Sequence, residues 1–423
     1  MSKKHLLFLS GLITILGLCG CGKTESNETS IVSGDSVHSE VSDGTGFAML
    51  QEPVSLSGFS ISEEGLNASV IREGNSSRIR DVLLRADAGE EITIAFIGGS
   101  ITQGSNASPM NTACYAYQTY DWFVHSFPEA QIHYVNAGIG ATDSYLGVHR
   151  LEEDVLSKNP DLVIVEFAVN DGETYNKESY ECLLRRVLTY KENTAVLPLI
   201  LTTEGGWDNS DVQQLLAFNY DLPVVSYKEL LRRGEVNWSQ VGDTDGVHPK
   251  NGGHTLIAHI LTNYFYNVCK NGEPATDYTL PGSLQTKGRY MDAGLYYANE
   301  ISTADNITVT EMDGFVEEAF DSPLSVHSGY GTAEGGKITF SVEAKAIGLC
   351  YAKTAAEEGG RFVVSVDGVE MTTLDTSWDE RSWNKTETVE VMKEMESGKH
   401  TLTIESVDGQ EGSLHILALM ISE

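Results

Sequence analysis

Basic residues are scarce in this sequence. Its 423 residues contain 28 lysines and arginines against 61 aspartates and glutamates, which gives a formal net charge of −33. A nucleic-acid backbone and an anionic lipid surface both repel a protein of this charge. The composition therefore argues against a nucleic-acid partner, and any attachment to a membrane must rest on something other than charge.

Long apolar stretches are lacking as well. Residues 6–18 form an apolar stretch behind two lysines, but it is too short to span a bilayer comfortably. A basic segment followed by a short apolar one is typical of a secretory signal peptide. The stretch ends in Leu18-Cys19-Gly20-Cys21, which resembles a bacterial lipoprotein signal with Cys21 as the lipidated residue. An ordinary cleaved signal peptide is the alternative.

The chain divides into four predicted segments. Residues 1–20 are the lipoprotein signal peptide, and residues 21–46 are the lipidated Cys21 and a flexible linker rich in Ser, Thr, Asn, Gly and acidic residues. Two folded domains follow, 47–273 and 274–423. Two or three acyl chains on Cys21 anchor a protein stably. We therefore expect a membrane-anchored lipoprotein at the bacterial cell surface or the periplasmic face.

Cysteine is rare beyond the signal. Four of the six cysteines lie in the folded part, and their wide separation leaves no Cys-x-x-Cys pair, which excludes a zinc ribbon or a thioredoxin-type site. We expect free structural thiols, with disulfides as the alternative in an exported protein. The four residues are Cys114, Cys182, Cys269 and Cys350.

The first folded domain alternates between strand and helix patterns. Apolar runs of strand length occur at 92–97, 131–135, 161–167 and 195–201, and segments such as 145–156 and 177–190 have apolar residues three and four apart. Strands without polar alternation are buried on both faces, as in a parallel sheet covered by helices. We predict an α/β domain with a flavodoxin-like, doubly wound parallel sheet.

The second folded domain has a different period. Residues 337–343, 361–366 and 400–405 alternate apolar and polar side chains, and Asp367-Gly368 is a turn signal. Short alternating strands of this density predict an antiparallel β-sandwich of the jelly-roll kind. Residues 47–67 also have strand character and fit either domain.

Residues suited to catalysis follow the predicted strands of the first domain. Ligands of open α/β sheets bind beyond the carboxyl ends of the strands, so these positions are informative. An Asp three residues before a His on a loop places a carboxylate against one ring nitrogen, which leaves the other to take a proton from a serine. The segments are Gly98-Gly99-Ser100-Ile101, Asn136 to Gly140, Ala168-Val169-Asn170-Asp171 and Asp245-Gly246-Val247-His248.

Taken together, these segments resemble the four conserved blocks of the SGNH (GDSL-like) hydrolase superfamily, over about residues 88–272. Two positions depart from the family pattern: Gly99 stands where the family has Asp, and Ala168 where it has Gly. Gly138 competes with Gly140 for the second block, and the run to Arg150-Leu151 favours Gly140.

The resemblance implies an ester hydrolase without a cofactor. Ser100 is the expected nucleophile, His248 the general base and then acid, and Asp245 the residue that orients His248. The expected oxyanion hole consists of the backbone N–H groups of Ser100 and Gly140 and the side-chain amide of Asn170. We expect no metal site, because the acidic residues near His248 come without a His-x-x-x-His pair or a Glu ligand pair.

The substrate follows less directly from the sequence. A tether outside the cell would face polymers, and the appended domain resembles the jelly-roll modules that accompany SGNH-type carbohydrate esterases. This resemblance implies an enzyme that removes O-acetyl groups from polysaccharide or oligosaccharide. Trp207 and Trp238 flank the predicted site and are candidates for a sugar-stacking wall. The alternatives are a lysophospholipase or short-chain lipid esterase, and a glycan-binding surface lipoprotein whose hydrolase domain is inactive. No obligate protein partner is evident.

Overall fold

The structure, a computed structural model, describes residues 47, 49–271, 278–320, 324, 327–355, 359–379, 384–407 and 411–423. The predicted signal peptide, Cys21 and the linker over 21–46 lie outside the described residues. So does the predicted domain boundary at 273/274. Gly44 to Glu423 form one compact unit, so contacts between its two domains belong to a single body.

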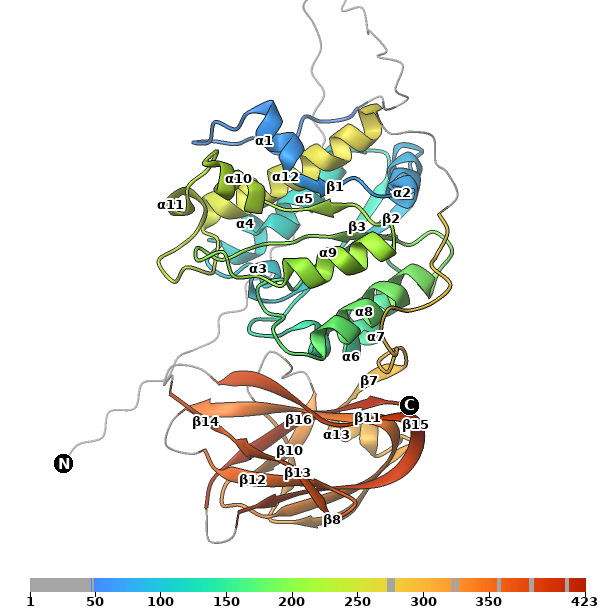
Figure 1. Cartoon of the computed structure of the whole chain (residues 1–423), viewed down its shortest axis with the longest axis vertical. Helices are drawn as coiled ribbons and strands as arrows, with labels where there is room; N and C mark the ends of the chain where they lie inside the picture. Colours follow the sequence, from blue (N-terminus) through green and yellow to red (C-terminus); the bar gives the residue numbers. More distant parts are fainter. Residues whose placement is uncertain are drawn as a thin grey trace, which may run out of the picture. The chain divides into compact units, whose positions relative to one another are not determined.

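A parallel sheet with helices on both sides forms the first domain (Figure 1). Its strand order is β3-β2-β4-β5, the doubly wound, flavodoxin-like order predicted from the sequence. A bridge from Leu199 to Val225 extends the parallel pairing toward β6. The strands are β2 (Glu91–Gly98), β3 (Gln131–Gly138), β4 (Leu162–Glu166), β5 (Ala195–Pro198) and β6 (Val224–Val225).

Both faces of this sheet are buried, which explains why its strands lack polar alternation. In β2, Ile94 and Phe96 lie in one core cluster with α2 (Ser77–Asp87), α5 (Tyr115–Ser126) and α12 (Asn251–Asn271). The alternate residues Ala95 and Ile97 lie in a second cluster with α6 (Ser144–His149), α8 (Asn176–Tyr190) and α9 (Ser210–Asn219). The sheet therefore separates two apolar layers.

The prediction of one continuous helix over 145–156 is wrong. It is divided into α6, α7 (Leu151–Asp154) and the 3₁₀ turn η1 (Leu156–Lys158). Arg150 leaves helical geometry at φ −89° and ψ 0°, and its side chain is fully buried. The remaining short helices are α1 (Glu63–Ala68), α3 (Ser100–Gln103), α4 (Met110–Ala113), α10 (Lys228–Arg233), α11 (Trp238–Val241) and α13 (Ala298–Ile301).

The described residues between 47 and 67, which fitted either domain by sequence, pack on the first one. Phe47 packs edge-on against Phe127, with ring centroids 6.3 Å apart. The backbone N–H of Val54 donates to the Thr262 hydroxyl of α12 at 3.0 Å. Just beyond this segment, β1 (Val70–Arg72) pairs antiparallel with β6.

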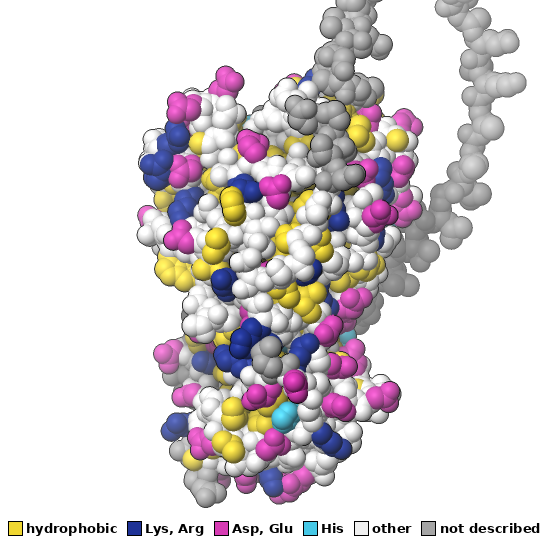
Figure 2. Space-filling view, turned by 45° about the vertical axis from the view of Figure 1, so that its right-hand side comes forward, with side chains coloured by type: hydrophobic (Ala, Val, Ile, Leu, Met, Phe, Trp, Pro, Cys, Tyr) yellow, Lys and Arg dark blue, Asp and Glu magenta, His cyan; other side chains and the backbone are white. Residues whose placement is uncertain are grey.

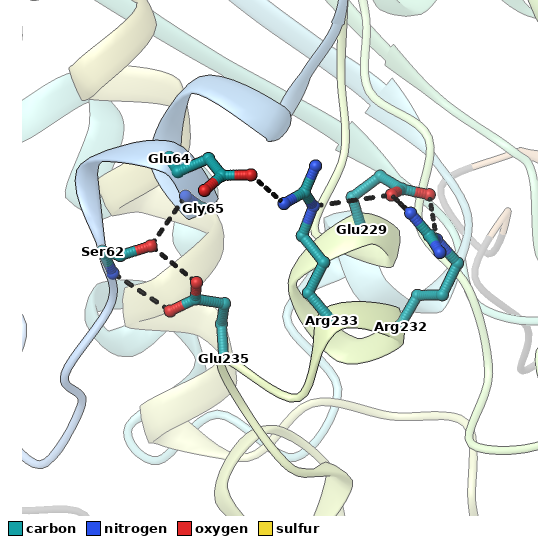
Figure 3. A network of polar contacts seen from close by, with 7 residues as sticks. All are labelled: Ser62, Glu64, Gly65, Glu229, Arg232, Arg233 and Glu235. Atoms are coloured by element: carbon teal, nitrogen blue, oxygen red, sulfur yellow. Dashed lines mark hydrogen bonds and ion pairs between the residues drawn. The ribbon is translucent and has the colours of Figure 1, made fainter.

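A surface network of polar and charged side chains connects α1 and the residue before it with α10 and the residues after it (Figure 3). The Ser62 hydroxyl donates to Glu235 Oε1 at 2.6 Å, and Glu64 Oε1 lies 2.7 Å from Arg233 Nη1. Arg233 also lies 3.8 Å from Glu229 of its own helix. Exposed pairs of this kind contribute little individually, so the network orients α1 more than it stabilises the fold.

Two long antiparallel strands organise the second domain. They are β11 (Lys337–Ala355) and β15 (Lys385–Ser406). The first part of β11 lies between β8 and β15, and its last part lies between β15 and β16, so β11 changes one of its neighbours along its length. The other strands are β7 (Ala293–Tyr296), β8 (Ile307–Asp313), β9 (Val316–Ala319), β10 (Ser328–Thr332), β12 (Arg361–Val366), β13 (Val369–Asp375), β14 (Ser377–Trp378) and β16 (Leu414–Ser422).

This arrangement confirms the predicted antiparallel C-terminal fold. The three alternating segments found in the sequence fall in β11, β12 and β15. Asp367 and Gly368 connect β12 to β13 with φ values of +52° and +78°, as a two-residue hairpin turn requires. The predicted turn is therefore present.

The sandwich packs directly against the first domain. Ala346, Cys350 and Met420 on its strands belong to the same core cluster as α6 and α8. Gly348 of β11 permits this contact, because a Cβ atom there would lie 2.3 Å from the Tyr145 hydroxyl. The connecting chain is also bound to α8, where the Glu181 carboxylate accepts the backbone N–H of Gln285 at 2.6 Å.

The four cysteines of the described residues are free and buried, as the sequence analysis expected. Among the helices that the structure describes, none has the length and apolar character needed to cross a membrane. Figure 2 shows acidic side chains spread over one face of the molecule, and basic side chains both near its middle and scattered above and below it. This surface agrees with the strongly negative net charge.

Candidate active site

A tight turn joins β2 to α3 and carries Ser100. A Cβ atom at Gly98 would lie 2.1 Å from Thr102 Oγ1 and 2.4 Å from the Glu166 carbonyl oxygen, so no larger residue fits there. Ser100 is the first residue of α3, and it lies at the carboxyl end of the strand. The turn therefore places a serine hydroxyl at the edge of the sheet where ligands bind.

Asn170 explains the unusual glycine at position 99. A Cβ atom at Gly99 would lie only 2.3 Å from Asn170 Oδ1, so the Asn170 amide occupies the space that a side chain would need. Gly99, where the family has Asp, thus allows a close contact between the turn after β2 and the turn after β4. The same contact brings Asn170 next to the turn that carries Ser100.

Gly140, and not Gly138, lies beside Ser100. A Cβ atom at Gly140 would lie 3.8 Å from Ser100 Cβ and 2.8 Å from Gln103 Oε1. Gly138 packs beneath α3 instead, where a Cβ atom would lie 2.1 Å from the backbone nitrogen of Gln103. The structure therefore brings Gly140 to the expected site and gives Gly138 a packing role.

The loop before α12 folds into a small hairpin that presents Asp245 and His248. The Asp243 N–H donates to the His248 carbonyl at 2.9 Å, and Gly246 takes a left-handed conformation with φ +72°. Asp245 Oδ1 accepts the backbone N–H groups of both Val247 and His248 at 2.9 Å. The three-residue spacing between Asp and His is what allows this local turn to hold the carboxylate against the imidazole.

Three side chains that are far apart in the sequence meet at this point. His248 Nε2 lies 2.8 Å from Ser100 Oγ. His248 Nδ1 lies 2.7 Å from Asp245 Oδ2. The imidazole therefore bridges the hydroxyl and the carboxylate in the order that nucleophilic catalysis needs.

A second loop, at 105–108, holds the hairpin in place, and sequence reasoning missed it. Asn106, in a left-handed conformation, donates its amide to Asp245 Oδ2 at 3.3 Å. Asn251 exchanges two hydrogen bonds with the Ser108 backbone, at 2.7 and 2.8 Å. Asn is one of the residues that tolerate left-handed backbone geometry. Asn106, in the loop after α3, was therefore the sequence feature that could have drawn attention to this loop.

The charge of Asp245 is stabilised where it lies. Burial by itself would raise the pKa of this carboxyl, but the backbone N–H groups of His248 and Val247 and the His248 ring favour the ionised form and lower its pKa from 3.8 to about 2. A carboxyl whose pKa is lowered on folding stabilises the fold above its unfolded pKa. That contribution is lost as the pH falls toward the folded pKa.

Asp245→Asn keeps the shape of the side chain and removes the charge. We expect the wild type to exceed this variant in free energy of unfolding by a constant amount above about pH 5, and the gap to shrink as the pH falls from about 4 to about 2. Urea unfolding followed by tryptophan fluorescence at a series of pH values measures the gap. A gap that stays the same down to pH ~2 contradicts the lowered pKa.

A buried carboxyl lies beneath the turn that carries Ser100. Glu166 is fully buried, and its Oε2 accepts a hydrogen bond from Thr102 Oγ1 at 3.0 Å; the Tyr115 hydroxyl lies 2.8 Å from the same Oγ1. Burial raises the pKa of Glu166 to about 7, although hydrogen bonds from Thr102 and Gly99 oppose the shift. Sequence reasoning did not single out Glu166, although it is the one charged residue within the apolar run 162–167.

A cavity of about 500 Å³ opens over Ser100, and both domains line it. The first domain contributes the residues singled out from the sequence. The second contributes Trp378 from β14 and the start of β15, which sequence reasoning did not place at the site. The lining residues are Ser100, Gln103, Ser105, Gly140, Ala141, Asn170, Val247, His248, Trp378, Asn384, Lys385 and Thr386.

Neither tryptophan predicted as a stacking wall is among the residues that line this cavity. Trp207 is 51% exposed, and its ring lies against Gly172, beyond the Asn170 turn. Trp238 packs against the core, and its indole N–H donates to the Asp243 carbonyl at 3.0 Å, which supports the hairpin. Among the described residues, the tryptophan that lines the cavity is Trp378.

Metal ligands do not gather in the described part of the chain, where no group of three or more His, Cys, Asp or Glu side chains is arranged to hold an ion. His254, which follows the hairpin, is fully buried and lies 3.0 Å from the Ser105 carbonyl. Burial lowers the pKa of His254 to about 4, so its imidazole is neutral near pH 7. Its contacts make it a structural residue.

Comparison with known proteins gives a family for this arrangement. Residues 96–256 match the model of the GDSL-like lipase/acylhydrolase family. The search of curated proteins returned no match.

Among solved structures, the chain is similar to a two-domain esterase active on acetylated mannans, solved alone and co-crystallized with mannopentaose. Sequence identity is 30% in both cases, the alignment covers 86% of this chain and 99% of that chain, and the TM-scores are 0.74 and 0.73. The similarity thus extends over both domains. The chain belongs to the SGNH (GDSL-like) hydrolases and is a carboxylic-ester hydrolase of the carbohydrate-esterase kind.

Proposed function

We propose that this protein removes O-acetyl groups from polysaccharide or oligosaccharide through a Ser100–His248–Asp245 triad. The observation that carries the proposal is the 2.8 Å separation of Ser100 Oγ and His248 Nε2 at the base of a cavity walled by both domains. An activated serine and a pocket open to a large substrate are what transfer of an acyl group from a glycan requires.

The first half of the reaction forms an acetyl-enzyme. Ser100 Oγ attacks the carbonyl carbon of the ester while its proton passes to His248 Nε2, and Asp245 stabilises the resulting imidazolium. The tetrahedral intermediate then collapses, the bond between the acetyl carbon and the sugar oxygen breaks, and His248 returns the proton to that oxygen. The deacetylated sugar leaves with a free hydroxyl group.

The second half releases acetate. A water molecule attacks the acetyl carbon and gives a proton to His248, and the intermediate expels Ser100 Oγ, which takes that proton back. In both halves the negative charge develops on the former carbonyl oxygen. We assign its stabilisation to the backbone N–H groups of Ser100 and Gly140 and the amide of Asn170, because all three residues line the same cavity.

The carbohydrate substrate is supported by the wall that the sandwich contributes. Trp378 offers a ring for stacking on a sugar, and Lys385 Nζ lies 5.2 Å from its centroid, so the cavity combines an aromatic surface with a polar one. The similar two-domain esterase acts on acetylated mannans, which makes acetylated mannan the first substrate to test. Lipidation at Cys21 would hold the enzyme outside the cytoplasm, where such polymers occur.

Acetate release tests the substrate class. We expect the wild type to release acetate from acetylated mannan and to hydrolyse octanoyl and decanoyl esters poorly. Trp378→Ala should lower kcat/KM for the polymer about tenfold, the effect of losing one stacking contact, and leave 4-nitrophenyl acetate hydrolysis near wild type. Trp207→Ala is the comparison, because that ring lies outside the cavity lining.

Two outcomes oppose the proposal in different ways. Faster hydrolysis of the long acyl esters than of the acetylated polymers would favour a lipid esterase. If Trp207→Ala lowered kcat/KM on acetylated mannan and Trp378→Ala did not, the glycan would contact the hydrolase loop, as the sequence analysis expected. The sandwich would then not belong to the substrate site.

A further inference from the structure

Arg150 is the largest side chain that is fully buried in the described part of the chain. Its one charged partner there is Asp154, whose Oδ2 lies 2.8 Å from Arg150 Nη1. Moving a cation out of water costs several kcal/mol, and well-packed apolar side chains often replace buried ion pairs without loss of stability. The guanidinium in this position is therefore better explained by the hydrogen bonds that its planar fork of N–H donors makes.

The fork binds two backbone carbonyl groups. Arg150 Nη1 donates to the Ala137 carbonyl at 2.7 Å, and Nη2 donates to the Gly98 carbonyl at 3.2 Å. These carbonyls belong to neighbouring strands: Gly98 ends β2, and Ala137 lies one residue before the end of β3. Arg150 thus bridges the two strands at their carboxyl ends.

These strand ends are the two that carry the backbone donors of the proposed oxyanion hole. Gly98 stands two residues before Ser100, and Ala137 stands three residues before Gly140. Beyond this point the pairing continues only through the Ile139 N–H, which donates to the Gly98 carbonyl at 3.1 Å. The Arg150 guanidinium therefore binds the last paired residues of the two strands, just before the chains separate.

We propose that Arg150 is a positioning residue, which holds the ends of β2 and β3 at the spacing that lets the N–H groups of Ser100 and Gly140 bind one oxyanion together. The inference rests on the proposed function of Ser100 and Gly140. Arg150 acts through these backbones and does not reach the substrate, so its loss should reduce the rate of the chemical step and leave substrate binding unchanged.

The test uses Arg150→Met and Arg150→Lys in the full chain. The kcat on 4-nitrophenyl acetate is measured per active site, counted by the end-point of fluorophosphonate labelling. Arg150→Met should lower kcat about 10²-fold, as expected for misplaced catalytic groups, with KM within about twofold of the wild type. Arg150→Lys keeps the charge beside Asp154 but lacks the planar fork, so its kcat should fall by roughly tenfold.

Arg186 provides the matched control. Its side chain is 11% exposed and also donates to two backbone carbonyls, those of Val148 at 2.6 Å and Ala293 at 2.9 Å, neither of which belongs to β2 or β3. Arg186→Met should keep the wild-type kcat per site even where its melting temperature falls. If Arg186→Met lost as much kcat as Arg150→Met, removing any buried arginine would have this effect, and the proposal would be overturned.

The remaining outcomes also decide the question. Wild-type kcat per site in Arg150→Met contradicts the proposal, and where that variant does not fold, wild-type kcat in folded Arg150→Lys contradicts it. Failure of the proposed function is recognised separately, because Ser100→Ala would then retain activity. A dead Ser100→Ala beside a fully active Arg150→Met would reject the role of Arg150 alone.

Discussion

Ser100→Ala is expected to reduce kcat for acetyl esters by about 10⁶-fold, to a residual rate that the oxyanion hole and substrate binding still keep above the uncatalysed one. The reason is that the hydroxyl removed is the group that forms the acetyl-enzyme, and His248 Nε2, 2.8 Å away, has no other nucleophile to activate in the first half-reaction. Acetate release and fluorophosphonate labelling both measure the loss. Since Ser100 is nearly buried and Ala is smaller, the fold should remain intact.

The double variant Ser100→Ala/His248→Ala makes the test sharper. Residues that act as one unit are strongly non-additive, so the double variant should be no slower than Ser100→Ala alone. A further large drop in the double variant would mean that His248 acts without Ser100, for example on a water molecule. Full esterase activity in Ser100→Ala would reject the proposed triad outright.

Asn170→Ala is expected to lower kcat by about 10²–10³-fold and to leave KM nearly unchanged. The amide lies against Gly99 and lines the cavity over Ser100, so it is placed to bind charge that exists only in the transition state. Steady-state kinetics on a small acetyl ester separates the two constants. Ser100 and the hydrogen bond to His248 remain, which is why activity should fall and not vanish.

Asn384→Ala is the control for this prediction. Asn384 also lines the cavity, but it comes from the sandwich and not from the turn after β4. Its removal should leave kcat on the small ester close to the wild type. A rise in KM with constant kcat in Asn170→Ala would show that the amide binds the ground state equally well, and Asn170 would then leave the oxyanion hole.

Much of the site followed from local features of the sequence. Strand ends of a parallel sheet share one edge, so Ser100, Gly140 and Asn170 were expected to meet once the strands before them had been recognised. The hairpin that presents Asp245 and His248 is closed by contacts within a few residues, which is why its spacing was already informative. Residues 21–46 and Cys21 lie outside the described part of the chain, and the lipid anchor stays a prediction.

The α/β and antiparallel classes of the two domains and the residues at the strand ends were already readable in the amino-acid sequence, because burial and turn chemistry act on near neighbours along the chain. Three features became visible only in the folded protein: Trp378, and not Trp207 or Trp238, lines the cavity, Asn106 contacts Asp245, and Arg150 bridges β2 and β3. Those contacts join residues that packing alone brings together, and no periodic pattern records them.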